Sequence, residues 1–180
     1  MALTKTHKIA MFVLALVSFI LFLVVGLQSN QLGLQAEPTV RDFPNAEVEL
    51  LTEQRVASNT LFDAPYQLVN VWASWCGYCK AEHPFLNQLA ENGIAIVGLN
   101  YRDSRGAASR YLGSAGNPYT SVIFDSSGLF SIDLGVVGTP ETYVVTREGQ
   151  IAYKYSGALT GEVWQRHFVS FFEQELVDDQ

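Results

Sequence analysis

The sequence predicts an α/β domain whose mixed sheet, part parallel and part antiparallel, is flanked by helices and preceded by one transmembrane helix. Three observations predict this. Apolar strand-like runs alternate with helical stretches over residues 67–134, two strand candidates joined by a short turn follow at 142–155, and residues 9–27 carry no charge. Alternating strands and helices favour parallel pairing, and a terminal hairpin adds antiparallel pairing.

The uncharged segment 9–27 is just long enough to span a bilayer as a helix. Lys5 and Lys8 precede it, so the positive-inside rule places residues 1–8 in the cytoplasm. A cleaved secretion signal is the alternative, although no convincing small-residue cleavage site follows. We therefore expect a single-pass protein of a bacterial inner membrane, with residues 28–43 as a polar linker and residues 44–180 as a periplasmic domain.

The net charge of the chain is −7, and it becomes −9 when Lys5 and Lys8 are left out. An acidic domain of this kind disfavours a nucleic-acid-binding surface. Nearly half of the residues are hydrophobic and aromatic residues are plentiful, which is typical of a folded domain with a sizeable core.

β-branched and aromatic residues between turn signals predict the strands. They are expected at 48–51, 67–73, 94–99, 121–124, 142–146 and 150–155. Residues 54–63 stay ambiguous between a hairpin and a loop. Asp125 to Gly128 is a turn signal, and residues 147–149 close the last hairpin.

Helices are expected where apolar residues recur at helical spacing and caps are present. The first follows the cysteines and ends at Asn92-Gly93, with Pro84 inside it. The second covers 104–112, with Ser104 as its N-cap and Gly113 as its stop. A short helix is expected at 129–134 and a longer one at 162–176.

Cys76 and Cys79 are the only cysteines of the chain, and they lie at the turn from a buried strand into a helix. Free N–H groups and the helix dipole at such a turn stabilise a thiolate. Cys76, at the start of the helix and expected to be exposed, is therefore the predicted nucleophile, and Cys79, one turn further, is the predicted resolving thiol. No other cofactor is expected beside this redox-active pair.

Other roles for the two cysteines fit less well. A structural disulfide with a two-residue spacer closes almost no loop. A zinc site would need ligands from His7, His83 and His167, which lack paired metal-ligand spacing. Haem attachment needs a histidine directly after the second cysteine, where this chain has Lys80. No metal site is therefore predicted, and His83 is expected to be a packed or exposed helix residue.

A family resemblance follows from four stretches. Trp75-Cys76-Gly77-Tyr78-Cys79 with the later Pro84 resembles the active-site helix of the thioredoxin fold. Three further stretches, at 97–103, 116–119 and 133–142, resemble the CcmG/DsbE family of membrane-tethered thiol:disulfide interchange proteins of cytochrome c maturation. The resemblance covers nearly the whole chain, and the stretch Gly-Val-Val-Gly-Thr-Pro-Glu-Thr at 135–142 is the most specific part of it.

The resemblance implies a periplasmic reductase. Its substrates would be the disulfide of apocytochrome c, or a mixed disulfide with a companion maturation protein, before haem attachment. A membrane electron donor of the DsbD/CcdA type would reduce it again. Two alternatives stay open: a general periplasmic disulfide oxidoreductase, and a non-catalytic tethered module that binds apocytochrome or a maturation partner.

The resemblance also assigns residues to the site. Thr139-Pro140 would face the dithiol, with Pro140 in cis, and would bind substrate together with Trp75. From the residue pattern alone an ordinary trans proline stays possible, since most bonds before proline are trans. Glu82 and Glu141 match acidic positions near the dithiol, where a carboxylate opposes thiolate formation and relays a proton.

Alternative readings of the two glutamates stay open as well. Glu82 would otherwise be a solvated helix residue, and Glu141 a strand-edge charge. Asn70 stands where ordinary thioredoxins carry a buried aspartate. Because an asparagine takes no proton, the task of general base would pass to Glu82.

Overall fold

The structure is a computed structural model of the whole chain, and it describes residues 11, 13–22 and 41–173. The chain divides into two units, Met1–Thr39 and Val40–Gln180. The predicted cytoplasmic residues 1–8 lie outside the described part, as do most of the predicted linker and the flanks of the predicted membrane span.

In the first unit, residues 11 and 13–22 are helical and their large apolar side chains are exposed. None of the helices within the described residues combines the length and the hydrophobicity needed to cross a membrane. The predicted membrane-spanning segment 9–27 extends beyond the described residues on both sides, so it stays a prediction.

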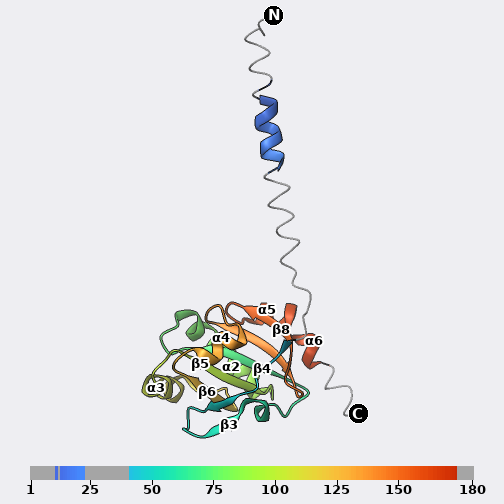
Figure 1. Cartoon of the computed structure of the whole chain (residues 1–180). Coiled ribbons are helices and arrows are strands. Elements are labelled where there is room, and N and C mark those ends of the chain that lie inside the picture. Colours follow the sequence, from blue (N-terminus) through green and yellow to red (C-terminus); the bar gives the residue numbers. More distant parts are fainter. Residues whose placement is uncertain (1–10, 12, 23–40, 174–180) are drawn as a thin grey trace, which may run out of the picture. The chain divides into compact units, whose positions relative to one another are not determined.

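The second unit is built on a six-stranded mixed sheet with the order β1-β8-β7-β4-β5-β6 (Figure 1). The central strands β4, β5 and β6 pair in parallel, whereas β7, β8 and β1 add antiparallel pairs on the other side of β4. The strands are β1 Arg41–Asp42, β4 Tyr66–Trp72, β5 Ile96–Tyr101, β6 Ser121–Asp125, β7 Glu141–Thr146 and β8 Gln150–Ser156. The predicted mixed sheet is confirmed.

Two hydrophobic clusters cover the two faces of the sheet. Leu68 and Trp72 of β4 pack on one face against α2, α3, α5 and α6, whereas Val69 and Val71 pack on the other face together with residues of α4. The helices are α2 Gly77–Glu91, α3 Arg105–Ala115, α4 Leu129–Leu134, α5 Gly161–His167 and α6 Val169–Phe172. Strict alternation along β4 therefore sends Leu68, Asn70 and Trp72 toward α2.

The ambiguous stretch 54–63 resolves into a short hairpin and one helical turn. β2 (Glu47–Glu49) pairs antiparallel with β3 (Arg55–Ala57), and the 3₁₀ helix η1 (Ser58–Leu61) follows. The linker was expected to extend to residue 43, but Arg41–Asp42 pairs with β8 and Phe43 is buried in the core. The folded unit therefore begins before residue 44.

Two helix ends differ from the sequence-based expectation. Ser104 caps α3 as predicted, but Gly113 does not stop this helix, which continues to Ala115 with Gly116 as its C-cap. Gly116 has a φ of 90°, the left-handed conformation that glycine adopts without steric cost. The last predicted helix is divided at Phe168, a turn residue between α5 and α6 whose φ of −118° departs from the ideal helix, while its side chain stays fully buried against Trp164.

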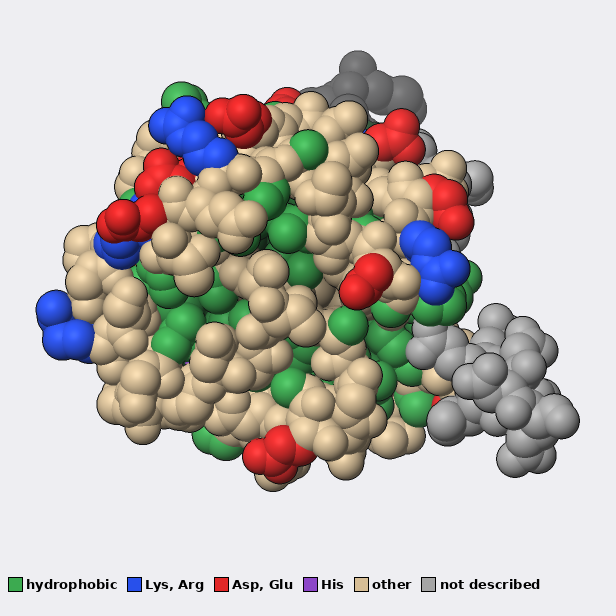
Figure 2. Space-filling model, turned by 90° about the horizontal axis from the view of Figure 1, so that it is seen from below, with side chains coloured by type: hydrophobic (Ala, Val, Ile, Leu, Met, Phe, Trp, Pro, Cys, Tyr) green, Lys and Arg blue, Asp and Glu red, His purple; other side chains and the backbone are tan. Residues whose placement is uncertain are grey.

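One face of this unit carries both acidic and basic side chains. On the face seen in Figure 2, basic and acidic side chains are scattered around the rim and gather into no extended basic patch. The expectation that the chain does not bind nucleic acid stays a prediction from its net charge.

Candidate active site

The two cysteines lie at the turn between β4 and α2. Cys76 is the N-cap of α2, with extended backbone geometry, and its Sγ accepts a hydrogen bond from the backbone N–H of Cys79 at 3.1 Å. The two Sγ atoms are 2.17 Å apart, in a disulfide. The sulfur of Cys76 thus occupies the place where a serine or aspartate oxygen usually caps a helix, which favours its anionic form after reduction.

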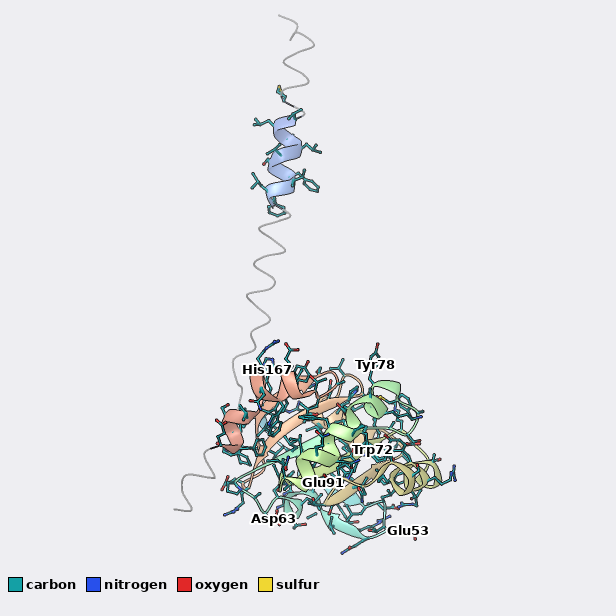
Figure 3. All side chains as sticks on the ribbon, turned by 180° about the vertical axis from the view of Figure 1, so that it is seen from behind. Glu53, Asp63, Trp72, Tyr78, Glu91 and His167 are labelled. Carbon is teal, nitrogen blue, oxygen red and sulfur yellow. A yellow bond between two sulfur atoms is a disulfide. The ribbon has the colours of Figure 1, made fainter. Side chains whose placement is uncertain are left out.

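The disulfide is shielded by its neighbours. Cys76 is 5% exposed and Cys79 is 2% exposed, so the structure corrects the expectation of an openly exposed Cys76. Trp75 and Tyr78, by contrast, are 57% and 75% exposed. Tyr78 projects away from the domain at the start of α2 (Figure 3). These two aromatic rings are therefore the exposed side chains next to the buried sulfurs.

The loop before Cys76 is held by Asp103, a residue that the sequence analysis missed. Its carboxylate accepts hydrogen bonds from the backbone N–H and hydroxyl of Ser74, from Asn100 and from the N–H of Ser104. Burial raises the pKa of Asp103, but these hydrogen bonds outweigh burial and leave the pKa below its usual value. The sequence did contain a signal for this role. Asp103 comes shortly after β5, and the carboxyl ends of the parallel strands β4 and β5 meet at the same edge of the sheet, beside the cysteines.

Trp75 is also tied to this edge. Its indole Nε1 donates to the carbonyl oxygen of Arg102 at 3.1 Å. The exposed ring is therefore held in one place beside the disulfide, which suits the substrate-binding role predicted for it.

Replacing Asp103 by alanine is expected to lower the free energy of unfolding by about 1–3 kcal/mol, because the N–H groups of Ser74 and Ser104 lose their acceptor. Urea unfolding of the oxidised protein measures this loss. Asp103→Asn retains one acceptor oxygen and is expected to lose less. Equal stability of Asp103→Ala and the wild type would contradict the anchoring role.

Glu82 lies on α2 three residues after Cys79, so the two side chains share a helix face. The glutamate is only 2% exposed, which excludes the alternative that it is a solvated helix residue. Its Oε1 accepts from Asn70 Nδ2 at 2.9 Å, and its Oε2 accepts from the backbone N–H of Leu159 at 2.6 Å. The structure thus joins Glu82 to Asn70, the residue at the position of the thioredoxin aspartate.

Burial raises the pKa of Glu82 from 4.5 to about 7, although the hydrogen bonds from Leu159 and Asn70 oppose this rise. A carboxyl group with this pKa exchanges protons readily near neutral pH. The position of Glu82 behind the dithiol and its pKa together suit a proton acceptor.

Thr139 and Pro140 line a groove on the same side of the domain as Tyr78. The Thr139–Pro140 peptide bond is cis, as the resemblance implied. The groove has a volume of about 570 Å³ and is mostly apolar. Its lining comprises Tyr78, Val137, Gly138, Thr139, Pro140, Glu141, Ser156, Gly157 and Ala158.

Glu141 is 1% exposed, so it is not a strand-edge charge in solvent. Its carboxylate lies 3.0 Å from Lys154 Nζ and accepts hydrogen bonds from Tyr143, Ser156 and the backbone N–H of Val137. Its oxygens are thus engaged with the protein itself. The carboxylate fixes the loop that carries Thr139 and Pro140, and this contact indicates a positioning role.

His83 is buried, and its Nε2 lies 3.0 Å from the carbonyl oxygen of Gly116. Its ring packs edge-on against Tyr111. Burial lowers the pKa of His83, so the neutral imidazole is favoured at neutral pH. Of the two alternatives that the sequence left open for this helix residue, packed or exposed, His83 is thus the packed one.

A disulfide at the first turn of the helix that follows a central strand, beside a loop with a cis proline, is the arrangement of a thiol:disulfide oxidoreductase with a thioredoxin-like fold. The Redoxin family matches residues 39–166. The chain belongs to this family and, within it, to the thiol:disulfide interchange proteins of the DsbE type.

Two relatives illustrate the match. The thiol:disulfide interchange protein DsbE of Haemophilus influenzae is 37% identical over 171 residues, which cover 88% of this chain and 94% of the relative. DsbE of Vibrio cholerae is 39% identical over 136 residues, 75% and 74% of the two chains.

Solved structures agree on the fold. The secreted thiol-disulfide isomerase of Corynebacterium glutamicum superposes with a TM-score of 0.63 at 20% identity, over 78% of this chain and 95% of that one. The thio-disulfide isomerase of Thermus thermophilus gives 0.60 at 24% identity, over 76% and 97%.

Proposed function

We propose that this oxidoreductase works as a reductase of protein disulfides. The Cys76 thiolate attacks one sulfur of the substrate disulfide, which forms a mixed disulfide and releases the other substrate sulfur as a thiolate. Cys79 then loses its proton to Glu82 and attacks Cys76. The Cys76–Cys79 disulfide forms, the second substrate thiolate leaves, and the two substrate thiolates take up protons from solvent.

The observation that carries the reducing direction is the buried Glu82 behind Cys79. Disulfide oxidants owe their high potential to a stabilised reduced form. A carboxylate beside the dithiol acts in the opposite sense, because its negative charge disfavours a neighbouring thiolate. Glu82 therefore destabilises the thiolate of the reduced form and makes the pair a better reductant.

The groove is the proposed substrate site. Trp75 and Tyr78 flank the sulfurs, and Thr139 and Pro140 offer backbone to an extended peptide, which adds to exposed backbone as a strand does. Glu141 acts indirectly. Its carboxylate accepts a hydrogen bond from the N–H of Val137 and so maintains the conformation of the loop that carries Thr139 and Pro140.

The proposed substrate is apocytochrome c, through the disulfide of its Cys-x-x-Cys-His motif, or a mixed disulfide with a companion maturation protein. The support is the CcmG/DsbE resemblance of the three stretches at 97–103, 116–119 and 133–142. The same resemblance supports a DsbD/CcdA-type membrane electron donor. Residues 9–27 would anchor the protein in a bacterial inner membrane, with residues 44–180 in the periplasm.

The reduction potential tests the direction. The full-length protein is equilibrated with glutathione or dithiothreitol redox buffers, and the fraction of Cys76–Cys79 disulfide is measured after acid quenching. We expect a potential more negative than about −180 mV, on the reducing side of protein disulfide isomerase. A potential near that of DsbA, about −120 mV, would instead make the protein a disulfide donor.

A peptide comparison tests the substrate. The reduced protein is offered the oxidised apocytochrome peptide with Cys-x-x-Cys-His and a scrambled disulfide peptide of the same composition. We expect a larger kcat/KM for the first. Equal values would favour a general disulfide oxidoreductase.

A further inference from the structure

Four side chains form a hydrogen-bonded cluster beneath α2. The hydroxyl of Tyr119 donates to Asn70 Oδ1 at 2.9 Å, and Asn70 Nδ2 donates both to Glu82 Oε1 and to Thr142 Oγ1, at 2.9 and 3.1 Å. Asn70 and Thr142 are 0% exposed, and Tyr119 is 6% exposed. The cluster lies outside the groove, so substrate contact does not account for it.

The chain makes room for this arrangement. Tyr119 stacks on Trp72, with ring centroids 5.5 Å apart. A Cβ on Gly98 would come within 2.9 Å of the Tyr119 ring and 3.0 Å of Trp72 Nε1. Glycine at position 98 thus permits the stacking that brings the tyrosine hydroxyl to Asn70.

The orientation of the Asn70 amide matters for Glu82. As observed, the NH₂ group faces the carboxyl, and a donor there stabilises the carboxylate. A flipped amide would turn its oxygen toward Glu82 and accept a proton from the neutral acid instead. The flip would also replace the acceptor of the buried Tyr119 hydroxyl by an NH₂ group, and a buried O–H without an acceptor is costly.

We propose that Tyr119 and Asn70 are positioning residues of the redox reaction. The tyrosine hydroxyl holds the asparagine amide in the orientation that favours the Glu82 carboxylate, so that Glu82 is ready to take the Cys79 proton. This inference rests on the role proposed above for Glu82. It adds a specific task for the asparagine that stands in place of the thioredoxin aspartate.

The titratable groups around Glu82 are few among the described residues. Cys79 lies on the same face of α2, and Tyr111 of α3 and Tyr119 are the tyrosines coupled to the carboxyl by charge. The residues that β4 and β7 contribute to the cluster, Asn70 and Thr142, are uncharged. Leu159 contacts Glu82 through its backbone N–H. Both tyrosines have a raised pKa because of burial, followed by the Glu82 charge, and stay neutral near pH 7.

Tyr119→Phe tests the proposal in the full-length protein, because phenylalanine keeps the ring that stacks on Trp72. The reduced protein is mixed with oxidised glutathione, and the decay of the mixed disulfide is followed by acid quenching between pH 5.5 and 9. We expect the midpoint of the pH profile to rise by about half to one unit. The rate should fall up to about tenfold below the midpoint and stay unchanged well above it.

A second readout reports Glu82 directly. The side-chain carboxyl of Glu82 is titrated by ¹³C NMR in the oxidised protein, and its pKa is expected to rise with the kinetic midpoint in Tyr119→Phe. Asn70→Leu, which removes the donor, should shift both in the same direction and at least as far. Tyr111→Phe is the matched control, since its hydroxyl makes no hydrogen bond to Asn70, and it should shift neither.

The variants distinguish the possible outcomes. Parallel upward shifts in Tyr119→Phe support the proposal. Unmoved midpoints, or an equal slowing at every pH, overturn it. Glu82→Gln is measured alongside, because it tests the role of Glu82 itself. If Glu82→Gln removes the inflection of the pH profile while Tyr119→Phe leaves its midpoint unchanged, Glu82 keeps its role as proton acceptor and only the positioning by Tyr119 is refuted. If the inflection persists in Glu82→Gln, both the proton-acceptor role of Glu82 and the positioning role of Tyr119 and Asn70 are refuted.

Discussion

Cys76→Ser is expected to abolish disulfide reduction, with a rate lower by on the order of a thousandfold or more, because a serine hydroxyl is un-ionised at neutral pH and is a weak nucleophile. The structure gives the reason for choosing Cys76 over Cys79. Its Sγ accepts the N–H of Cys79 at the helix N-terminus, so its thiolate is the better stabilised of the two. Single-turnover reduction of a disulfide peptide by the full-length protein measures the loss.

Cys79→Ser is the matched control. It retains the attacking sulfur, so it should form the mixed disulfide at a rate near that of the wild type and then stall, because no second thiol releases the substrate. Mass spectrometry of the quenched reaction detects the adduct. Accumulation of adduct on Cys79 in the Cys76→Ser variant would reverse the two roles.

The second large effect concerns stability. The pKa of Glu82 is raised from 4.5 to about 7 in the folded protein, so the folded state binds a proton more tightly than the unfolded chain. The stability that this preference contributes is fully present below pH 4.5 and is lost as the pH rises through 7. Wild-type protein should therefore lose about 3 kcal/mol over this interval from Glu82 alone.

Glu82→Gln removes this titration. A glutamine has only one acceptor oxygen, so its NH₂ group would face one of the two donors, Asn70 Nδ2 or the Leu159 N–H. The loss of stability from this unfavourable contact does not depend on pH. The readout is therefore the difference in unfolding free energy between wild type and variant, measured with denaturant on the oxidised proteins at pH 4.5 and pH 8. The variant should gain about 3 kcal/mol relative to the wild type from the lower to the higher pH.

Glu91→Gln is the control for this experiment. Glu91 lies at the end of the same helix (Figure 3) and is exposed, so the loss of its charge should leave the pH dependence almost unchanged. A pH-independent difference between Glu82→Gln and the wild type would mean that Glu82 is not perturbed by burial.

Local pattern was sufficient for most of the elements. The β-branched run before Cys76 forms β4, the signals at Asn92-Gly93 end α2, and Ser104 caps α3, because strands, caps and turns depend on a few neighbouring residues. The errors lie where packing overrides such signals. Gly113 stays helical inside α3, and Phe168 interrupts the last helix while its ring stays in the core.

For the site, the sequence by itself determined the chemistry: two cysteines at a strand-to-helix turn, and a motif around Thr139-Pro140 that named the family. Only the tertiary structure decided what surrounds them. Asp103 reaches back to Ser74, Tyr119 reaches Asn70, and Asn70 reaches Glu82, across separations of 29, 49 and 12 residues. Such contacts follow from how strands pair and helices cover them, so the burial that raises the pKa of Glu82 was beyond any local pattern.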